Sequence, residues 1–208
     1  KISEDELIDL ACSTSDVEML NILAVNANCE VRCTVAKNKN TPVELLTALA
    51  KDEKVDVRCV VANNRNTPVN VLAMLAKDEN GNVRCTVTNN RNTSADVLAM
   101  LAKDENIVVR SAVAWNESTP ADVLAMLVSD KTWWVRNIVA RNKNTPIELL
   151  SVLAQDEKWL VREQVALNAS TPAEVLAMLA KDSNKKVSKE AKDALKARKE
   201  KSKVNIGR

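Results

Sequence analysis

The chain of 208 residues contains no histidine, no phenylalanine and no tyrosine, and it has only two glycines. The lack of histidine excludes histidine-based acid–base catalysis, Ser–His and Cys–His nucleophiles, and histidine-ligated metal sites. Two glycines cannot form the glycine-rich loop that cradles phosphate groups in many nucleotide-binding proteins. These absences argue against an enzyme, and we expect no catalytic residue and no cofactor.

The sequence also lacks long apolar runs and an excess of either charge. No stretch of about 18 apolar residues is present, so we expect no membrane-spanning segment. The first ten residues, KISEDELIDL, are too charged for a signal peptide. The 30 Lys and Arg residues nearly balance the 28 Asp and Glu residues, which disfavours a general polyanion binder. Five cysteines without framework spacing indicate a reducing compartment, and we expect the cytoplasm.

The sequence is dominated by a repeat of 26 residues, marked by a recurring Val-Arg pair. Numbered from that valine, the repeat always has Val at position 5, Asn at position 8, Leu at positions 16 and 19, and Asp at position 22. The pairs are Val31-Arg32, Val57-Arg58, Val83-Arg84, Val109-Arg110, Val135-Arg136 and Val161-Arg162. The sequence therefore predicts six regular repeats over residues 31–182, a degenerate copy over 5–30 and a divergent Lys-rich end over 183–208. We expect residues 1–208 to form a single repeat domain.

Each repeat has the pattern of two short helices. Thr-Pro pairs such as Thr41-Pro42 predict an N-cap followed by proline at the first helical position, and Glu44, Glu148 and Glu174 would complete capping boxes. Leucines form one stripe on this helix, and the invariant Asp then caps a second helix that buries Val at positions 1 and 5. The Asn at position 8 is predicted to end the second helix in the left-handed conformation. No strand pattern appears, so the expected fold is an all-α solenoid of about seven two-helix repeats.

The pattern V-R-x-x-V-A-x-N-x-x-T-P-x-x-L-L-x-x-L-A-x-D resembles the leucine-rich repeat variant family, bacterial proteins built from short paired helices. The resemblance implies a right-handed superhelix in which one helix of each pair can be partly 3₁₀. A member of the family holds an iron–sulfur cluster through clustered cysteines near its N-terminus. Here Cys12, Cys29 and Cys33 lack a CxxC motif, so the cluster is not carried over. HEAT-like solenoids are a second, weaker resemblance.

The positions that differ between repeats lie together on one side of the second helix. At about 100° per residue, positions 1 and 5 define its core face, and positions 3, 4, 7 and 26 fall on the opposite side. Position 7 holds Lys37, Asn63, Asn89, Trp115, Arg141 and Leu167, and position 26 holds Asp56, Asn82, Val108, Trp134, Leu160 and Lys186. The outward positions of the other helix barely vary. This contrast predicts one uniform solvated face and one variable binding face.

All four tryptophans lie on these variable helices. Adjacent repeats stacked at about 8–10 Å would gather the rings into one patch, and tryptophan is enriched at binding hot spots. We therefore expect a protein or peptide partner, contacted by Trp115, Trp133, Trp134, Trp159, Asn137, Arg141, Asn89 and Leu160. The alternative interpretation is that the rings fill grooves between helices or form a homodimer contact.

Two invariant or recurring residue types admit a second interpretation. The Arg at position 2 follows an invariant Asp by six residues, which favours a structural Arg–Asp ladder between repeats over a line of phosphate clamps. Cys29 and Cys33 lie four residues apart on one helix and could supply two metal ligands. Without histidine or a CxxC motif, we expect no metal site.

Nucleic-acid binding by a HEAT-like solenoid is the alternative function. Position 9 forms a basic loop column of Lys39, Arg65, Arg91 and Lys143, and the last 28 residues carry eleven Lys or Arg against four acids. Glu117 and Ala169 interrupt the column, and the first 180 residues have a net charge of −5, which disfavours a long phosphate track. The Lys-rich end is more simply a solvated terminal helix.

Overall fold

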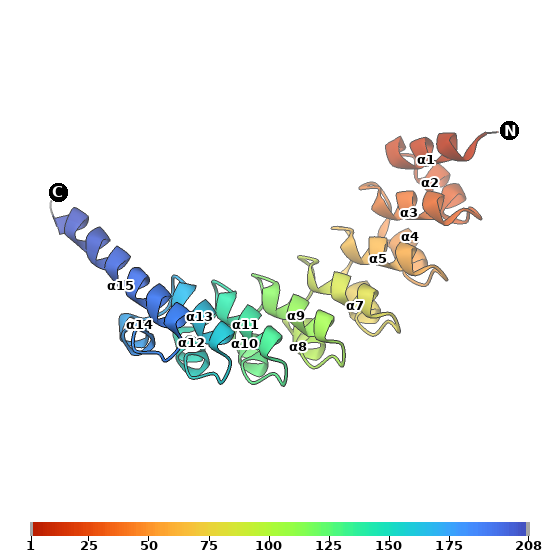
Figure 1. Ribbon diagram of the computed structural model, residues 1–208. Coiled ribbons are helices and arrows are strands. Elements are labelled where there is room, and N and C mark those ends of the chain that lie inside the picture. Colours follow the sequence, from red (N-terminus) through yellow and green to blue (C-terminus); the bar gives the residue numbers. More distant parts are fainter. Residues whose placement is uncertain (1, 207–208) are drawn as a thin grey trace. The chain divides into compact units, whose positions relative to one another are not determined.

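The computed structural model describes residues 2–206, and over this range the chain forms fifteen α-helices and no strand (Figure 1). The helices are α1 (Glu4–Ser13), α2 (Val17–Ala24), α3 (Cys29–Lys37), α4 (Val43–Leu49), α5 (Val55–Asn63), α6 (Val69–Leu75), α7 (Gly81–Thr88), α8 (Ala95–Leu101), α9 (Ile107–Trp115), α10 (Ala121–Leu127), α11 (Trp133–Arg141), α12 (Ile147–Leu153), α13 (Trp159–Leu167), α14 (Ala173–Leu179) and α15 (Lys185–Ile206). None of these helices, in the part of the chain described, combines the length and apolar character needed to cross a bilayer. The predicted all-α class is confirmed.

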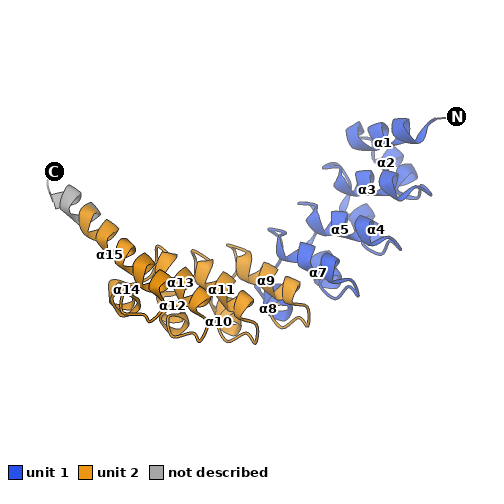
Figure 2. Cartoon of the chain, viewed as in Figure 1, with its two compact units in different colours: residues 1–101 blue, residues 102–208 orange. Residues whose placement is uncertain are grey.

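The chain divides into two compact units, residues 1–101 and 102–208 (Figure 2). Within each unit, helices that carry the variable positions alternate with shorter helices. The variable helices are α1, α3, α5 and α7 in the first unit and α9, α11, α13 and α15 in the second. Consecutive variable helices of a unit pack against each other, and the short helices pack against the variable ones. Each unit is therefore a stack of two-helix repeats, the arrangement of an α-solenoid, while the extent of a single domain over residues 1–208 stays a prediction.

The core lies between the variable helices and the short helices of each unit. Positions 1 and 5 are fully buried from α3 through α13, as at Val135 and Val139, and the leucines at positions 16 and 19 of the short helices, such as Leu150, are buried as well. The same register continues into the Lys-rich end, because Val187 and Ala191 of α15 are also fully buried. The start of α15 is thus one more variable helix, and its apolar face covers the last repeat.

The 3₁₀ character that the resemblance implied is confined to the turns. Every helix in residues 2–206 is an α-helix. After α4, however, the amide of Lys51 donates to the carbonyl of Ala48 at 3.0 Å, and the amide of Asp52 donates to Leu49 at 3.1 Å. These i→i−3 bonds tighten the exit from the short helix. They bring the invariant Asp close to the start of the next variable helix.

The Thr-Pro pairs do not cap helices in the way the sequence predicted. Proline itself occupies the N-cap of α4, and no side chain caps that helix, α12 or α14. Thr41 is buried, and its hydroxyl donates to the carbonyl of Val35 at 2.5 Å, closing the end of the preceding helix. Glu44, Glu148 and Glu174 are exposed and form no capping box. A buried carbonyl without a donor costs more free energy than exposed amides at a helix start, because water can bond to those amides. The threonine hydroxyl therefore donates to the buried carbonyl and does not cap the next helix.

The invariant Asn at position 8 ends the variable helix, but not in the left-handed conformation that was predicted. Asn64 has φ −69° and ψ 130°, and no residue of the described range has a positive φ. Its side chain instead links two repeats. Nδ2 donates to the carbonyl of Ala36 in the preceding repeat at 2.7 Å, and Oδ1 accepts from the amide of Asn66 at 2.8 Å. The side-chain amide thus bonds to a free carbonyl at the end of the preceding variable helix and to a backbone amide of the loop that follows Asn64.

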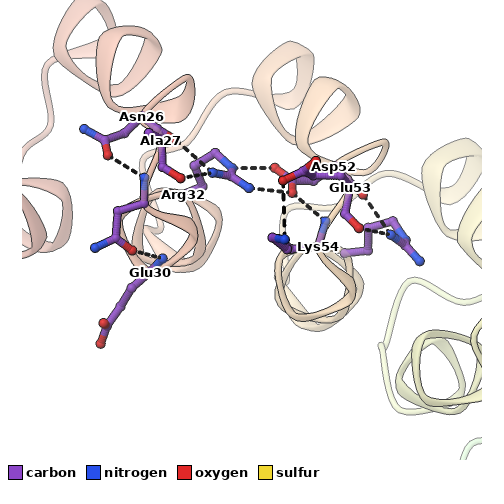
Figure 3. A network of polar contacts seen from close by, with 9 residues as sticks. Asn26, Ala27, Glu30, Arg32, Asp52, Glu53 and Lys54 are labelled. Atoms are coloured by element: carbon purple, nitrogen blue, oxygen red, sulfur yellow. Dashed lines mark hydrogen bonds and ion pairs between the residues drawn. The ribbon is translucent and has the colours of Figure 1, made fainter.

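The Arg–Asp ladder is confirmed. Nε of Arg32 lies 2.7 Å from Oδ2 of Asp52, Nη2 donates to Oδ1 at 2.9 Å, and Nη1 donates to the carbonyl of Asn26 at 2.8 Å (Figure 3). Each guanidinium therefore joins the turn before its own helix to the turn before the next variable helix. The same paired geometry recurs at Arg58–Asp78, Arg110–Asp130, Arg136–Asp156 and Arg162–Asp182.

The ladder keeps its aspartates charged. Burial by itself raises the pKa of Asp52, but hydrogen bonds from Arg32 and from the amide of Lys54 outweigh it, so the pKa lies below its ordinary value. The same balance lowers the pKa of Asp78, Asp130 and Asp156. For Asp182, the hydrogen bond from Arg162 is the largest influence and lowers the pKa directly. Because these side chains are almost buried, the loss of either partner would leave the other as an unpaired buried charge, which lowers the free energy of unfolding.

The ladder predicts acid sensitivity with a defined sign. A carboxyl whose pKa is lower in the folded state adds stability that is complete above its unfolded pKa, about 3.9, and is lost as pH falls through the folded value. The free energy of unfolding, measured by urea titration with circular dichroism, should change little between pH 7 and about 5 and fall steeply below about 4. Asp156→Asn should be less stable at pH 7 and lose less below pH 4. An equally steep acid loss in that variant would contradict the prediction.

The Asn column predicts a difference between two amides of one loop. Asn142 donates to the buried carbonyl of Ala114 at 2.8 Å, whereas Asn144 is exposed and donates to Glu117. Asn142→Ala should lower the free energy of unfolding by about 1–3 kcal/mol, because a buried carbonyl loses its donor. Asn144→Ala, the matched control, should cost less than about 1 kcal/mol, since water can replace its amide. Equal losses in the two variants would show that burial does not set the cost.

Candidate partner-binding surface

Of the positions that the sequence assigned to the outer side of the variable helices, position 7 and most of position 26 are exposed, whereas positions 3 and 4 are half-buried or buried. Position 7 is exposed from α3 through α13, and it lies at the end of the helix or, at Asn89, at its C-cap. Of the predicted contact residues, Asn89 belongs to residues 1–101, and the other seven belong to residues 102–208. The surface that carries the tryptophans is therefore built from residues 102–208 alone.

Trp115 and Trp134 are the two most exposed rings. Trp115 is the last residue of α9 and is 53% exposed, whereas Trp134 is the second residue of α11 and is 47% exposed. Positions 26 and 7 are seven residues apart, or about two helical turns, so they lie on the same side of each helix. The two rings thus belong to two parallel columns, one near the starts and one near the ends of α9, α11 and α13.

The rings are not gathered into a single cluster. Trp133 contacts Trp134 edge to face, with ring centroids 5.7 Å apart and planes at 86°. Trp159 instead lies beneath the ammonium of Lys186, which is 5.3 Å from its centroid. Trp133 and Trp159, which share position 25 of the repeat, are half-buried. These two rings contact Trp134 and Lys186, and they offer less exposed area to a partner than Trp115 and Trp134 do.

Arg141 engages Trp115 across one repeat. Its guanidinium carbon lies 4.7 Å from the centroid of the Trp115 ring. At an exposed site such a cation–π contact contributes about 0.5–1 kcal/mol. Arg141 was predicted to orient a partner directly. The contact gives it a second role, because it fixes the exposed ring at the end of α9.

Asn137 is a correction to the predicted contact residues. It is only 8% exposed, and its Nδ2 donates to the carbonyl of Leu160 at 2.8 Å. The helical period placed this side chain on the outer side, but the hydrogen bond shows that it faces α13. Asn137 therefore holds α11 and α13 together and is not available to a partner. Leu160 itself is half-buried.

The choice of contact residues from sequence missed two exposed apolar side chains. Val108 at the start of α9 is 55% exposed, and Leu167 at the end of α13 is 53% exposed. Both occupy variable columns, but they were not selected because the choice followed the aromatic rings. The Trp surface, as we define it, consists of Val108, Trp115, Trp134, Arg141, Leu160 and Leu167.

The cysteines form no metal cluster within the described residues. All five are free thiols, and no group of three or more potential ligands occurs in this part of the chain. Burial raises the pKa of Cys33 to about 11, and it also raises the pKa of Cys59 and Cys85. These three thiols are therefore protonated at neutral pH.

Comparison with known proteins supports the repeat architecture. Residues 30–53 and 159–184 match the model of the family described as leucine rich repeat variant. A solved structure described as a leucine-rich repeat variant with a novel repetitive protein structural motif is 26% identical to this chain, with a TM-score of 0.70, and the match covers 91% of this chain and 80% of that chain. The X-ray structure of YibA from Escherichia coli has a TM-score of 0.51 at 17% identity, over 94% of this chain and 98% of that chain, and shows a similar fold only.

No curated protein sequence matches the chain. The two matched repeats nevertheless carry the motif of the family, and the structural match extends over nearly the whole chain. These findings confirm the resemblance that the repeat motif indicated, and the chain is an all-α repeat protein similar in sequence and in fold to the leucine-rich repeat variant proteins.

Proposed function

We propose that the protein is a non-enzymatic repeat scaffold that binds a protein or peptide partner through the Trp surface of residues 102–208. The observation that carries the proposal is the exposure of Trp115 and Trp134 on the side of the solenoid whose residues differ between repeats. The core needs no ring at these positions, because it is built from Val, Leu and Ala. A repeat scaffold that displays two half-exposed indoles on its variable side has the chemistry of an interaction surface.

The two exposed rings are held in place before any partner arrives. Trp134 contacts Trp133 edge to face, and Trp115 lies under Arg141. Binding to ordered side chains loses less conformational entropy than binding to mobile ones. A buried indole can contribute 150–250 Å² of contact area. The Trp surface therefore suits a partner segment with apolar anchors and with carbonyl or carboxylate acceptors near Arg141.

The alternative function, nucleic-acid binding, has less support on this unit. Lys143, the position 9 cation of residues 102–208, forms an exposed ion pair with Glu117, with Nζ 2.5 Å from Oε2. The next repeat has Ala169 at this position.

The five free thiols fit a reducing compartment such as the cytoplasm.

Trp134→Ala tests the proposal. A large ring near the centre of an interface contributes about 2 kcal/mol or more, so truncation should weaken partner binding at least tenfold. The helical circular dichroism signal should persist, because nearly half of the ring is exposed. The measurement is a pull-down from the source cell with wild-type protein and variant, followed by titration calorimetry on the proteins that only the wild type retains. Unfolding of the variant would show that the ring is part of the core.

Two valines provide a matched control. Val108 on the Trp surface and Val152 on α12 are both 55% exposed. Val108→Ser should weaken partner binding, and Val152→Ser should leave it unchanged. Equal losses would contradict the assignment of the surface. Light scattering distinguishes self-association from partner binding. If the wild type is a homodimer and Trp134→Ala is a monomer, the Trp surface is a contact between two copies of the chain.

A further inference from the structure

Residues 1–101 carry a different surface, an open basic groove. Its volume is about 700 Å³, and it crosses α5 between the ends of α3 and α7. Lys37, Lys39, Arg65 and Arg91 line it, and no carboxylate does. A hollow of about 360 Å³, lined in part by Asn89, continues from Arg65 to Arg91. The groove therefore concentrates four cations on one side of this unit.

The four cations are unpaired, unlike their counterpart in the other unit. Among the described residues, none of the four makes an ion pair, whereas Lys143 at the same repeat position is paired with Glu117. Unpaired cations that face one groove repel each other weakly, and an anionic ligand would remove that repulsion. The charge is thus available to a ligand.

The backbone that carries these cations is fixed by hydrogen bonds between repeats. Nδ2 of Asn66 donates to the carbonyl of Lys39 at 2.7 Å, and Nδ2 of Asn92 donates to the carbonyl of Arg65 at 2.8 Å. Each loop is therefore anchored to the loop before it. Lys39, Arg65 and Arg91 consequently stand in register, one per repeat, at the helix-packing distance of about 8–10 Å.

We propose that this groove binds an acidic peptide segment in the polyproline II conformation, with a carboxylate at every third residue. A polyproline II chain has three residues per turn and rises about 3.1 Å per residue, so side chains on one face recur every ~9 Å. This spacing matches the loop cations Lys39, Arg65 and Arg91, of which each repeat supplies one. Each Arg can bind a carboxylate with two parallel hydrogen bonds, which gives geometric specificity as well as affinity.

The floor of the groove suits a peptide. Cys59 and Val60 line it together with Asn63 and Thr86, so it offers apolar area beside amide and hydroxyl groups. Burial raises the pKa of the Cys59 thiol, which therefore stays neutral and does not repel a carboxylate. The amide of Asn63 can bond to the polar backbone of an extended chain, which has no internal hydrogen bonds. The hydroxyl of Thr86 already donates to the carbonyl of Asn82 at 2.8 Å, so it can only accept from a backbone amide.

A nucleic acid fits the groove less well. A DNA duplex carries one negative charge per ~1.7 Å of axis, far denser than one cation per repeat. The unit as a whole is acidic, with eleven Lys and Arg against fourteen Asp and Glu in residues 1–101. A long polyanion would meet that net repulsion, whereas a short peptide touches only the groove.

The test uses the full chain and a fluorescent peptide with Glu at every third position and Pro or Ala between. Fluorescence anisotropy should show binding, and a peptide of the same composition with adjacent Glu residues should bind at least several-fold more weakly. Arg65→Gln and Arg91→Gln should each weaken binding about tenfold, the loss expected for one charge-assisted hydrogen-bonded pair. Lys51→Gln and Lys77→Gln, exposed outside the groove, should change nothing.

Three outcomes would overturn the proposal. The first is equal binding of the spaced and clustered peptides, and the second is an affinity that Arg65→Gln leaves unchanged. The third is tighter binding of a single-stranded oligonucleotide that Arg65→Gln weakens, which would make the groove a nucleic-acid site. Trp134→Ala should leave peptide binding intact, so failure here is distinct from failure of the proposed Trp surface.

Discussion

The buried ion pair between Arg at position 2 and Asp at position 22 is the interaction on which each repeat depends. Helices of seven to ten residues, such as α1 to α14, are not stable alone in water, and loops between them need something to fix their course. Arg58 meets this need three times. It pairs with Asp78, it donates to the carbonyl of Asp52, and its stem covers the core. One side chain thus sets the spacing between the two turns that flank one helix pair, α5 and α6.

This internal bonding leaves the outer positions free to differ. Val at positions 1 and 5, Asn at 8, Thr at 11 and Leu at 16 and 19 are buried or bonded between elements, as at Asn168 and Thr171. Positions 7 and 26 lie outside the core and are mostly exposed, and their contacts between repeats, such as Arg141 over Trp115, join surface side chains. A repeat protein can therefore change its surface chemistry without changing its fold.

Local sequence pattern predicted the helices and the ladder, but it could not reveal bonds that cross repeats. The 26-residue period gave the helix pairs, and the recurrence of Arg and Asp in every repeat predicted the ion pairs. In these pairs, however, the Arg binds the Asp 20 residues later, as in Arg58–Asp78, and bonds only to the backbone carbonyl of the residue six positions before it. Thr41 and Asn64 were assigned as local caps, whereas their partners lie at the end of the preceding helix and in the preceding repeat. Asn137 failed for the same reason, since its partner is in α13. The sequence placed Lys39, Arg65 and Arg91 in one basic column, but it could not show that Lys37 joins them in a groove that no carboxylate lines.

The same repeat positions carry different chemistry in the two units. Position 7 supplies Lys37 and Asn63 in residues 1–101 but Trp115 and Leu167 in residues 102–208. Position 9 is an unpaired cation in the first unit, whereas Lys143 in the second is paired with Glu117. Indoles gain most from apolar contact, and unpaired guanidinium groups gain most from carboxylates. Surfaces that differ in this way select different ligands, so the two units are expected to recognise separate partners or separate segments of one partner.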